Sequence, residues 1–231
     1  MKGLWLLPTR RRIPILRRFL ECCFNTGVST PGVILVQKDE FEECRQEYEA
    51  IPLPNAWAYI STEADSMPGK MRELWPYIKE LDWAGGMVDD LVPHSVAWDR
   101  TLVQTLNGRN FVTCNDGEQA PRRAVGSFVI SGDLMRAAGH FVHPPKFGHT
   151  YADNVWEDLG RETGCWDIRM DVLITHEHPF KTGIQDETHN IAYSQESEDE
   201  KRYLEWCVME KPQTVARIRA LMDSPRYATI I

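Results

Sequence analysis

Residues 32–39 have the sequence Gly-Val-Ile-Leu-Val-Gln-Lys-Asp, and this stretch decides the class of fold to expect. A run of apolar residues closed by polar ones is typical of a strand buried on both faces of a parallel sheet. A second apolar run, Leu4–Leu7, precedes it, and between the two the apolar side chains of residues 16–24 recur at helical spacing. A strand, a crossover helix and a second strand predict a parallel β-α-β unit.

The same alternation continues through the first half of the chain. Further strands are expected at Trp57–Ile60 and Gly85–Val88, and helices at Phe41–Ala50 and Met71–Ile78. Pro76 is expected to kink or interrupt the second of these helices, because proline lacks the backbone N–H that a helix interior needs. Three repeated strand–helix units predict an α/β fold with a Rossmann-like, mostly parallel central sheet flanked by helices.

The second half of the chain has a mixed pattern. In chain order, the expected elements are a helix near Ser95–Leu106, strands at Asn110–Cys114 and Ala124–Ile130, helices near Asp133–Ala138 and Asp153–Glu162, and a strand at Asp171–Thr175. The residues after 200 are expected to form helices that pack onto the body. No internal repeat and no low-complexity linker divides the chain, which favours a single domain.

The composition is that of an ordinary globular protein. The chain has 231 residues, of which 42% are hydrophobic and 26% charged, and these values argue against global disorder. No apolar stretch approaches the roughly 18 residues that a membrane-spanning helix needs. None of the six cysteines shows CxxC spacing, which argues against a structural zinc site and favours a reduced, cytoplasmic protein.

The charge is distributed unevenly along the chain. The net charge is −8, but residues 1–20 contain six basic and no acidic residues, so the rest of the chain carries −14. Such a start could be a transit peptide, although a strand followed by a helix explains it equally well. The basic cluster suggests a bound anion, either a phosphate-bearing small molecule or nucleic acid. The overall acidity argues against an extended nucleic-acid surface.

Polar residues follow each expected strand of the first half. These strand ends are Pro8-Thr9-Arg10, Gln37-Lys38-Asp39, Ser61-Thr62-Glu63 and Asp89-Asp90. Open parallel sheets bind ligands outside the carboxyl ends of their strands. A carboxylate pair there can hold a divalent cation that neutralises a diphosphate leaving group. Two adjacent acids can also be solvated or cap a helix, and the spacing alone leaves both interpretations open.

His176 and His178 follow the expected strand Val172–Ile174. Residues i and i+2 of an extended segment point to the same side, so both imidazoles could face one metal ion. Thr175–Pro179 also matches the start of the metallo-β-lactamase signature, but Phe180-Lys181 replaces the Asp-His that would continue it. A metal-dependent hydrolase using the two histidines stays an alternative, as does a structural pair with one histidine buried and one solvated.

Asp153 opens an expected helix and has two interpretations. It fits the N-cap position, where a carboxylate accepts hydrogen bonds from the first backbone N–H groups. It could also take a proton from an acceptor hydroxyl if it lines the same cleft as Asp90.

Several of these segments occur together in a recognisable order. They are Leu6–Arg10, a strand ending in Asp39, Gly69-Lys70 at a helix start, Val88–Pro93 with the acid pair, and Asp153–Trp156. Over about residues 1–180 the chain resembles nucleotide-sugar glycosyltransferases of the GT-A type, close to the large inverting family 2 group. The resemblance implies one GT-A type domain over residues 1–231. It would comprise a nucleotide-binding half (1–93), an acceptor and catalytic half (94–200) and C-terminal helices (201–231).

The resemblance also implies a set of residues that bind the nucleotide-sugar. Pro8, Thr9 and Arg10 would meet the nucleotide, and Asp39 would accept hydrogen bonds from its base, usually uracil. Lys70 would lie near the sugar or the diphosphate.

A second set of residues would serve the metal and the reaction. Asp89-Asp90 is similar to the Asp-x-Asp-type motif of these enzymes, with Asp89 near the nucleotide-sugar and Asp90 as a ligand of Mn²⁺ or Mg²⁺. His176 or His178 would complete the metal site, and Asp153 would be the catalytic base.

The function that the resemblance implies is metal-dependent, inverting transfer of a sugar from a nucleotide-sugar, with a UDP-sugar expected, to an acceptor hydroxyl. The clusters Arg10–Arg12, Arg17-Arg18 and Arg122-Arg123 are compatible with a bacteriophage enzyme that modifies hydroxymethylated pyrimidines of DNA in the host cytoplasm. A saccharide or peptide acceptor is equally compatible, and so is a noncatalytic nucleotide-binding module. The sequence does not indicate an oligomeric state.

Overall fold

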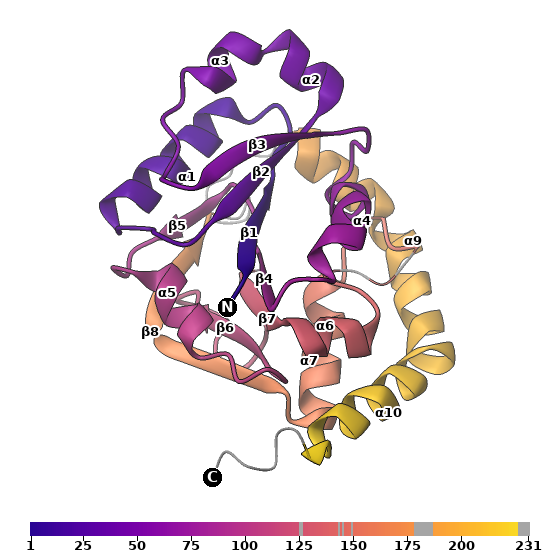
Figure 1. Ribbon diagram of the computed structural model, residues 1–231. Helices are drawn as coiled ribbons and strands as arrows, with labels where there is room; N and C mark the ends of the chain where they lie inside the picture. The colour runs from indigo at the N-terminus through magenta and orange to yellow at the C-terminus, as the bar shows by residue number, and fades with distance from the viewer. Residues whose placement is uncertain (125–126, 143, 145, 149, 178–186, 226–231) are drawn as a thin grey trace.

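A computed structural model describes residues 1–231 except 125–126, 143, 145, 149, 178–186 and 226–231 (Figure 1). The strands of the described part are β1 (Gly3–Pro8), β2 (Gly32–Gln37), β3 (Trp57–Thr62), β4 (Trp83–Gly86), β5 (Leu91–Pro93), β6 (Phe111–Asn115), β7 (Phe128–Ser131) and β8 (Trp166–His176). The helices are α1 (Ile13–Asn25), α2 (Lys38–Glu43), α3 (Arg45–Glu49), α4 (Met67–Ile78), α5 (Trp98–Gln104), α6 (Gly132–Ala138), α7 (Ala152–Thr163), α9 (Glu187–Met209) and α10 (Lys211–Met222).

The strands form one mixed sheet in the order β3-β2-β1-β4-β7-β6-β8-β5. Strands β1 to β4 pair in parallel, with Leu6 opposite both Val33 of β2 and Gly86 of β4. Strand β7 is antiparallel to β4 and β6, whereas β8 is parallel to β6 and antiparallel to β5. The expected α/β architecture, with a Rossmann-like first half and a mixed second half, is confirmed.

The central strand β1 shows why the apolar runs predicted this architecture. Successive side chains of a strand point to opposite faces of the sheet. Trp5 and Leu7 belong to the core that α1 and α5 cover, whereas Leu6 belongs to the core that α4, α6 and α7 cover. Figure 1 shows these two helical layers on either side of the sheet. An uninterrupted apolar run is therefore needed, because both faces of the strand are buried.

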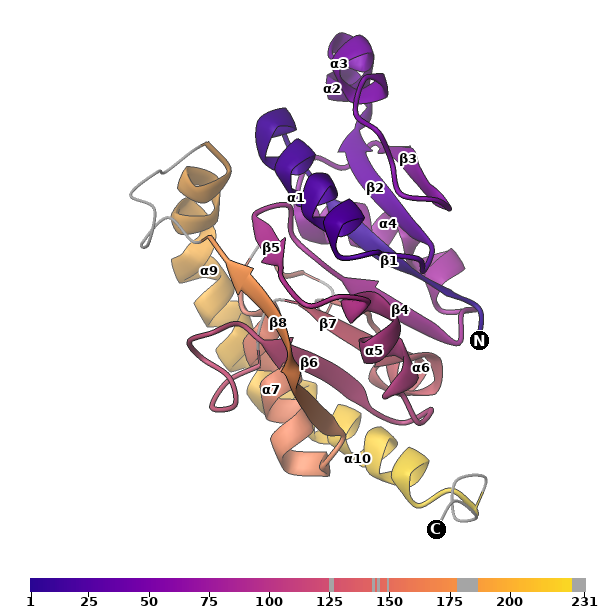
Figure 2. The ribbon, with the colours of Figure 1, turned by 90° about the vertical axis from the view of Figure 1, so that its left-hand side faces the viewer.

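Helices α2 and α3 lie at one end of the molecule and α10 at the other. Figures 1 and 2 both place α2 and α3 beyond the carboxyl end of β2, and α10 at the opposite end of the molecule. Helix α10 packs against α6, where Arg217 donates hydrogen bonds to the carbonyl oxygens of Ala137 (2.7 Å) and Ala138 (3.2 Å). Helices were expected after residue 200, and α9 and α10 occupy that region, although α9 begins earlier.

Several local expectations differ from the structure. Strand β4 covers Trp83–Gly86 and not Gly85–Val88, and β8 begins at Trp166 and not at Asp171. The single helix expected over residues 41–50 is instead the two short helices α2 and α3, which meet at Cys44. The interruption expected at Pro76 does not occur, since α4 continues through it to Ile78 and Pro76 lies in the last turn. The short strand β5 was not expected, because its three residues are too few to show a periodic pattern.

The arrangement of the strands brings three polar segments together: the end of β1, the acid pair Asp89-Asp90 and the end of β8. The amide nitrogen of Thr9 donates to the carbonyl oxygen of Leu35 (3.0 Å), so the end of β1 lies beside β2. Past the end of β4, the amide nitrogen of Met87 donates to the carbonyl oxygen of Leu6 (3.0 Å), which carries the chain on toward the acid pair. The pairing of Leu91 with His176 places the end of β8 beside the acid pair.

None of the helices in the described part of the chain has the length and apolar character that crossing a bilayer requires.

Candidate active site

Arg12 bridges the two carboxylates of the acid pair. Its Nη1 atom donates to Oδ1 of Asp89 at 2.6 Å, and its Nη2 atom donates to Oδ2 of Asp90 at 3.0 Å. The exposed fractions are only 9% for Arg12, 2% for Asp89 and 5% for Asp90. Because the guanidinium group is planar and carries its donors as a fork, it holds the two carboxylates in a fixed relative position.

The acid pair has further partners on two other segments. The hydroxyl of Thr9 donates to Oδ2 of Asp89 at 2.7 Å, and Nε2 of His176 lies 3.0 Å from Oδ1 of Asp90. Burial alone would raise the pKa of Asp90. The hydrogen bond and charge of His176, together with the Arg12 guanidinium, outweigh burial and hold the pKa well below its usual range. Asp90 is therefore an ionised carboxylate at neutral pH.

Lys70 reaches the same place from α4. Its ammonium donates to the carbonyl oxygen of Thr9 at 2.6 Å, and the residue is 1% exposed. Burial lowers the pKa of Lys70, against the opposing charges of Glu40, Asp65 and Asp89. The first turn of α4 is held by the N-cap Ser66, whose hydroxyl oxygen accepts from the amide nitrogen of Gly69 at 3.2 Å.

The expected nucleotide-binding residues take different positions around this centre. Arg10 pairs with Asp65 at 3.1 Å, in the segment between β3 and α4. Asp39 is exposed in the first turn of α2, and the neighbouring Glu40 is the buried acid. Glu40 accepts from the amide nitrogen of Arg11 at 2.5 Å and from the hydroxyl of Tyr48. Pro8 ends β1, one residue before Thr9.

Asp153 is the second residue of α7 and not its N-cap. The cap is Tyr151, which has φ 69° and makes no side-chain cap hydrogen bond, so the N-cap interpretation is wrong. Oδ1 of Asp153 accepts from the amide nitrogen of Asn154 at 3.0 Å. Burial raises the pKa of Asp153, against the opposing effects of that hydrogen bond and of Arg123. A carboxyl group with a raised pKa is suited to proton transfer.

A buried acid of α9 fixes the segment that leads into α7. Asp199 is 0% exposed and accepts from the amide nitrogens of Gly148 (2.7 Å) and Thr150 (2.9 Å). Next along the chain, the ring of Tyr151 stacks on Tyr203 of α9, with centroids 5.1 Å apart. The sequence gives little sign of this role, because Asp199 lies in an acidic run in which most side chains are solvated.

The fit of a divalent cation to this site is partial. Asp90 and His176 offer an oxygen and a nitrogen donor side by side, which suits a divalent transition metal. His178 lies outside the described residues. Within the described part of the chain, no group of three or more His, Cys, Asp and Glu side chains could hold a metal ion. A cation that bound both Asp89 and Asp90 would first have to displace the guanidinium of Arg12.

The metallo-hydrolase alternative requires His176 and His178 to hold a metal ion that activates a water molecule. His176 instead contacts Asp90 and thus belongs to the acid-pair site. Beside it, Glu177 forms an ion pair with Arg18 at 2.5 Å.

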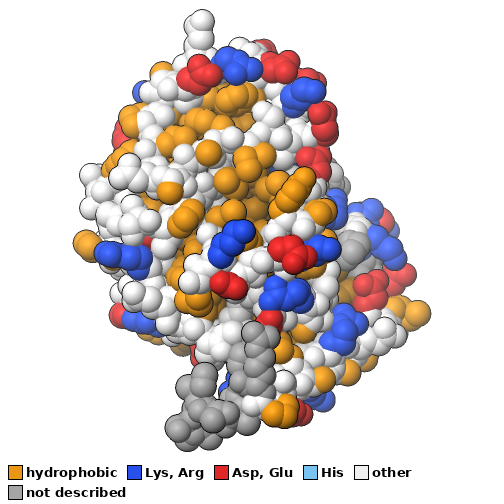
Figure 3. Space-filling model, in the orientation of Figure 1, with side chains coloured by type: hydrophobic (Ala, Val, Ile, Leu, Met, Phe, Trp, Pro, Cys, Tyr) orange, Lys and Arg blue, Asp and Glu red, His pale blue; other side chains and the backbone are white. Residues whose placement is uncertain are grey.

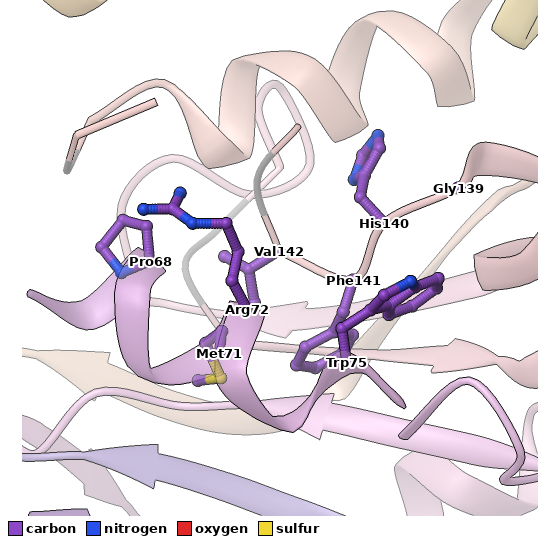
Figure 4. A pocket seen from close by; sticks show the side chains of 8 residues that line it. All are labelled: Pro68, Met71, Arg72, Trp75, Gly139, His140, Phe141 and Val142. Atoms are coloured by element: carbon purple, nitrogen blue, oxygen red, sulfur yellow. The ribbon is translucent and has the colours of Figure 1, made fainter. Parts of the chain in front are cut away.

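A pocket of about 250 Å³ opens between α4 and the segment that follows α6 (Figure 4). Its lining residues are Pro68, Met71, Arg72, Trp75, Gly139, His140, Phe141 and Val142. The four from α4 are three or four residues apart and share one face of that helix, whereas Lys70 reaches Thr9 from another side. The pocket is therefore separate from the acid-pair site.

His140 is a core residue and not an acid or base of this pocket. Figure 4 shows its imidazole pointing away from α4. The ring packs against Trp156, with centroids 5.3 Å apart, and burial lowers the pKa of His140 to about 3. The imidazole is therefore neutral at physiological pH.

Comparison with known proteins identifies the fold. No family model matches the sequence, and a search of curated proteins finds no match either. A mannosyltransferase of Pyrobaculum calidifontis, solved with GDP-Man and Mn²⁺, has a TM-score of 0.57 at 12% identity, over 100% of this chain and 76% of that one. Glucosyl-3-phosphoglycerate synthase of Mycobacterium tuberculosis, solved with Mn²⁺, UDP and glucosyl-3-phosphoglycerate, has a TM-score of 0.52 at 11% identity, over 80% and 81%. The chain has the GT-A fold.

This fold is not confined to sugar transfer. A 4-diphosphocytidyl-2C-methyl-D-erythritol synthase of Anaerococcus prevotii has a TM-score of 0.51 at 8% identity, over 73% of this chain and 86% of that one. At identities this low the likeness establishes the fold alone, so the activity has to be argued from the site.

Proposed function

We propose that the protein is a glycosyltransferase that moves a sugar from a nucleotide-sugar to an acceptor hydroxyl. The observation that carries the proposal is the convergence of the acid pair with Arg12, Lys70 and His176 at the carboxyl ends of the parallel strands. Ligands of open α/β sheets bind at this edge. Buried cations beside ionised carboxylates suit a diphosphate together with a divalent cation.

In this proposal Asp90 and His176 hold Mn²⁺ or Mg²⁺, with His178 as a further candidate ligand. When bound, the cation would neutralise the negative charge of the departing diphosphate. Both glycosyltransferases compared above were solved with Mn²⁺, which supports manganese as the first metal to test.

Residues of the chain would hold the rest of the donor. Lys70 and Thr9 lie beside the acid pair, where the diphosphate would bind, and Asp89 keeps Thr9 in place. Pro8 and Arg10 flank this position and would meet the nucleoside. Asp39, exposed at the end of β2, would accept hydrogen bonds from the base. UDP is the first nucleotide to test, since the synthase compared above was solved with it.

The chemical step would be a direct displacement at the anomeric carbon. The acceptor oxygen forms the new bond as the bond to the diphosphate oxygen breaks, and the hydroxyl proton passes to the carboxylate of Asp153. This sequence inverts the anomeric configuration. The raised pKa of Asp153 supports its role as general base, because a base works best when its pKa approaches the working pH.

The acceptor that we propose to test first is a hydroxymethylated pyrimidine in DNA, with saccharides and peptides as the alternatives. The arginine clusters of the sequence support a polyanionic acceptor. On the face in Figure 3, however, Lys and Arg side chains are interspersed with Asp and Glu, so that face carries no broad basic field. A DNA contact would therefore have to be local.

A thermal-shift panel tests the donor class. UDP, GDP, dTDP and CMP are each added with and without Mn²⁺, because a ligand that binds only the folded state raises the melting temperature. A metal-dependent shift with one nucleoside diphosphate is expected. A shift with Zn²⁺ alone, and none with any nucleotide, would contradict the proposal and favour a metallo-hydrolase.

A further inference from the structure

The guanidinium of Arg12 lies between the carboxylates of Asp89 and Asp90. It donates to one oxygen of each carboxylate, at 2.6 and 3.0 Å. The other oxygen of Asp89 accepts from Thr9, and the other oxygen of Asp90 faces His176. The two carboxylates thus already have a cation, supplied by the chain itself.

Displacing this guanidinium would leave a buried cation without its counter-charges. Removing one partner of a buried ion pair is strongly unfavourable unless another group of the same sign replaces it. Lys70 is also buried, and its ammonium donates to the carbonyl oxygen of Thr9, whose hydroxyl donates to Asp89. An anion of a nucleoside diphosphate that bound between Arg12 and Lys70 would supply the missing negative charge.

We infer that Arg12 is an internal cation that opposes the binding of a divalent metal at Asp90 and is transferred to the diphosphate when the donor binds. The inference rests on the proposed function for the identity of the anion. Metal alone binds weakly, because the guanidinium of Arg12 already neutralises the charge of Asp90. Metal and nucleoside diphosphate together bind tightly, because the diphosphate receives the expelled guanidinium.

Linkage makes this inference quantitative. If UDP tightens Mn²⁺ binding by some factor, Mn²⁺ must tighten UDP binding by the same factor. We expect a factor of about ten or more, equal to about 1.4 kcal/mol of coupling. The part of this coupling that comes from competition should disappear when Arg12 no longer carries a charge.

The test measures Mn²⁺ binding to the full chain by calorimetry and by the electron spin resonance of free Mn²⁺, with and without UDP. Arg12→Gln should bind Mn²⁺ alone about tenfold more tightly than the wild type, with a smaller effect of UDP. Mn²⁺ affinity that is unchanged or weaker in Arg12→Gln would overturn the inference. Arg12→Lys, which keeps the charge but loses the fork, should have intermediate affinity and serves if the glutamine variant does not fold.

Arg11→Gln is the matched control. Arg11 is the neighbouring residue, its side chain is 62% exposed, and it pairs with Glu43 and not with the acid pair. Arg11→Gln removes the same charge as Arg12→Gln. Its Mn²⁺ affinity therefore measures any gain that comes only from the lower net positive charge. An equal gain in Mn²⁺ affinity in Arg11→Gln and Arg12→Gln would also overturn the inference. If UDP binds none of the proteins, the proposed function fails, while the comparison of Mn²⁺ affinities still decides the role of Arg12.

Discussion

Nε2 of His176 lies 3.0 Å from Oδ1 of Asp90, although the two residues come from opposite halves of the chain. Antiparallel pairing places Leu91 of β5 opposite His176 of β8. The amide nitrogen of Glu177 also donates to the carbonyl oxygen of Asp90 at 3.0 Å, which fixes the backbones on both sides of the contact. His176 and the acid pair Asp89-Asp90 therefore form one site.

Asp90→Asn should destabilise the protein at pH 7 by about 3 kcal/mol, because it leaves Arg12 with one carboxylate fewer in a buried site. The folded-state pKa of Asp90 lies below its ordinary value of 3.8. Its ionisation therefore stabilises the fold above pH 3.8, and this contribution is lost as the pH falls through the lowered pKa. Denaturant unfolding from pH 7 to pH 2 should show the gap between wild type and variant closing only below pH 3.8. A constant gap would count against this account.

Asp153→Asn should reduce sugar transfer by about 10²- to 10⁴-fold and leave UDP binding nearly intact, because the amide cannot accept the acceptor's proton. Because burial raises the pKa of Asp153, activity should fall with decreasing pH already above 3.8, the ordinary value. Single-turnover transfer rates measured over a pH series test both statements. Glu162→Gln, in the last turn of α7 with a side chain 42% exposed, is the control and should keep its activity. Full activity of Asp153→Asn would remove this residue from the role of base.

Lys70→Met should weaken UDP binding by roughly tenfold or more, because a hydrogen bond to a charged group contributes about 1.5–3 kcal/mol. Binding of uridine, which has no diphosphate, should stay the same. Methionine fills a similar volume but removes the donor to the carbonyl oxygen of Thr9, so the melting temperature should fall modestly. Calorimetric titrations with UDP and uridine measure the difference, and Lys79→Met at the end of α4 serves as control. Equal losses for both ligands would place Lys70 away from the diphosphate.

Asp199→Asn should lower the free energy of unfolding by about 1–3 kcal/mol, because the amide cannot replace both acceptor oxygens that hold Gly148 and Thr150. Glu198→Gln, the neighbouring and largely exposed acid, should change it by less than about 0.5 kcal/mol. Denaturant unfolding of both variants makes the comparison. Equal stability of the two would show that Asp199 does not hold the segment before α7.

Binding to hydroxymethylated DNA, if DNA is the acceptor, should weaken steeply with salt. Each phosphate neutralised by a basic side chain lowers the slope of log affinity against log salt by about 0.9. Fluorescence anisotropy with a labelled duplex measures the slope between about 50 and 200 mM salt. Over this range the affinity should fall roughly 10³-fold or more. A flat response would exclude DNA and direct the search to saccharide or peptide acceptors.

Much of the framework of the site could be predicted from the sequence. An apolar run such as residues 32–36 indicates a strand that is buried on both faces of the sheet. The polar residues that follow the run indicate where the strand ends. Parallel pairing then brings strand ends together, which is why Thr9 and Asp89 were expected near each other and are in contact. The resemblance placed Lys70 near the sugar or the diphosphate, and in the structure its ammonium donates to the carbonyl oxygen of Thr9.

The tertiary structure alone decided which charged side chains turn inward. Among Arg10, Arg11 and Arg12, only the packing of the loop between β1 and α1 selects Arg12 to meet the acid pair. The same holds at the end of β2, where Glu40 is buried and the expected Asp39 is exposed. A local sequence pattern indicates which positions of one strand or helix face the core. The partner of a buried charge depends instead on which distant segments the sheet brings together, and no local pattern records that.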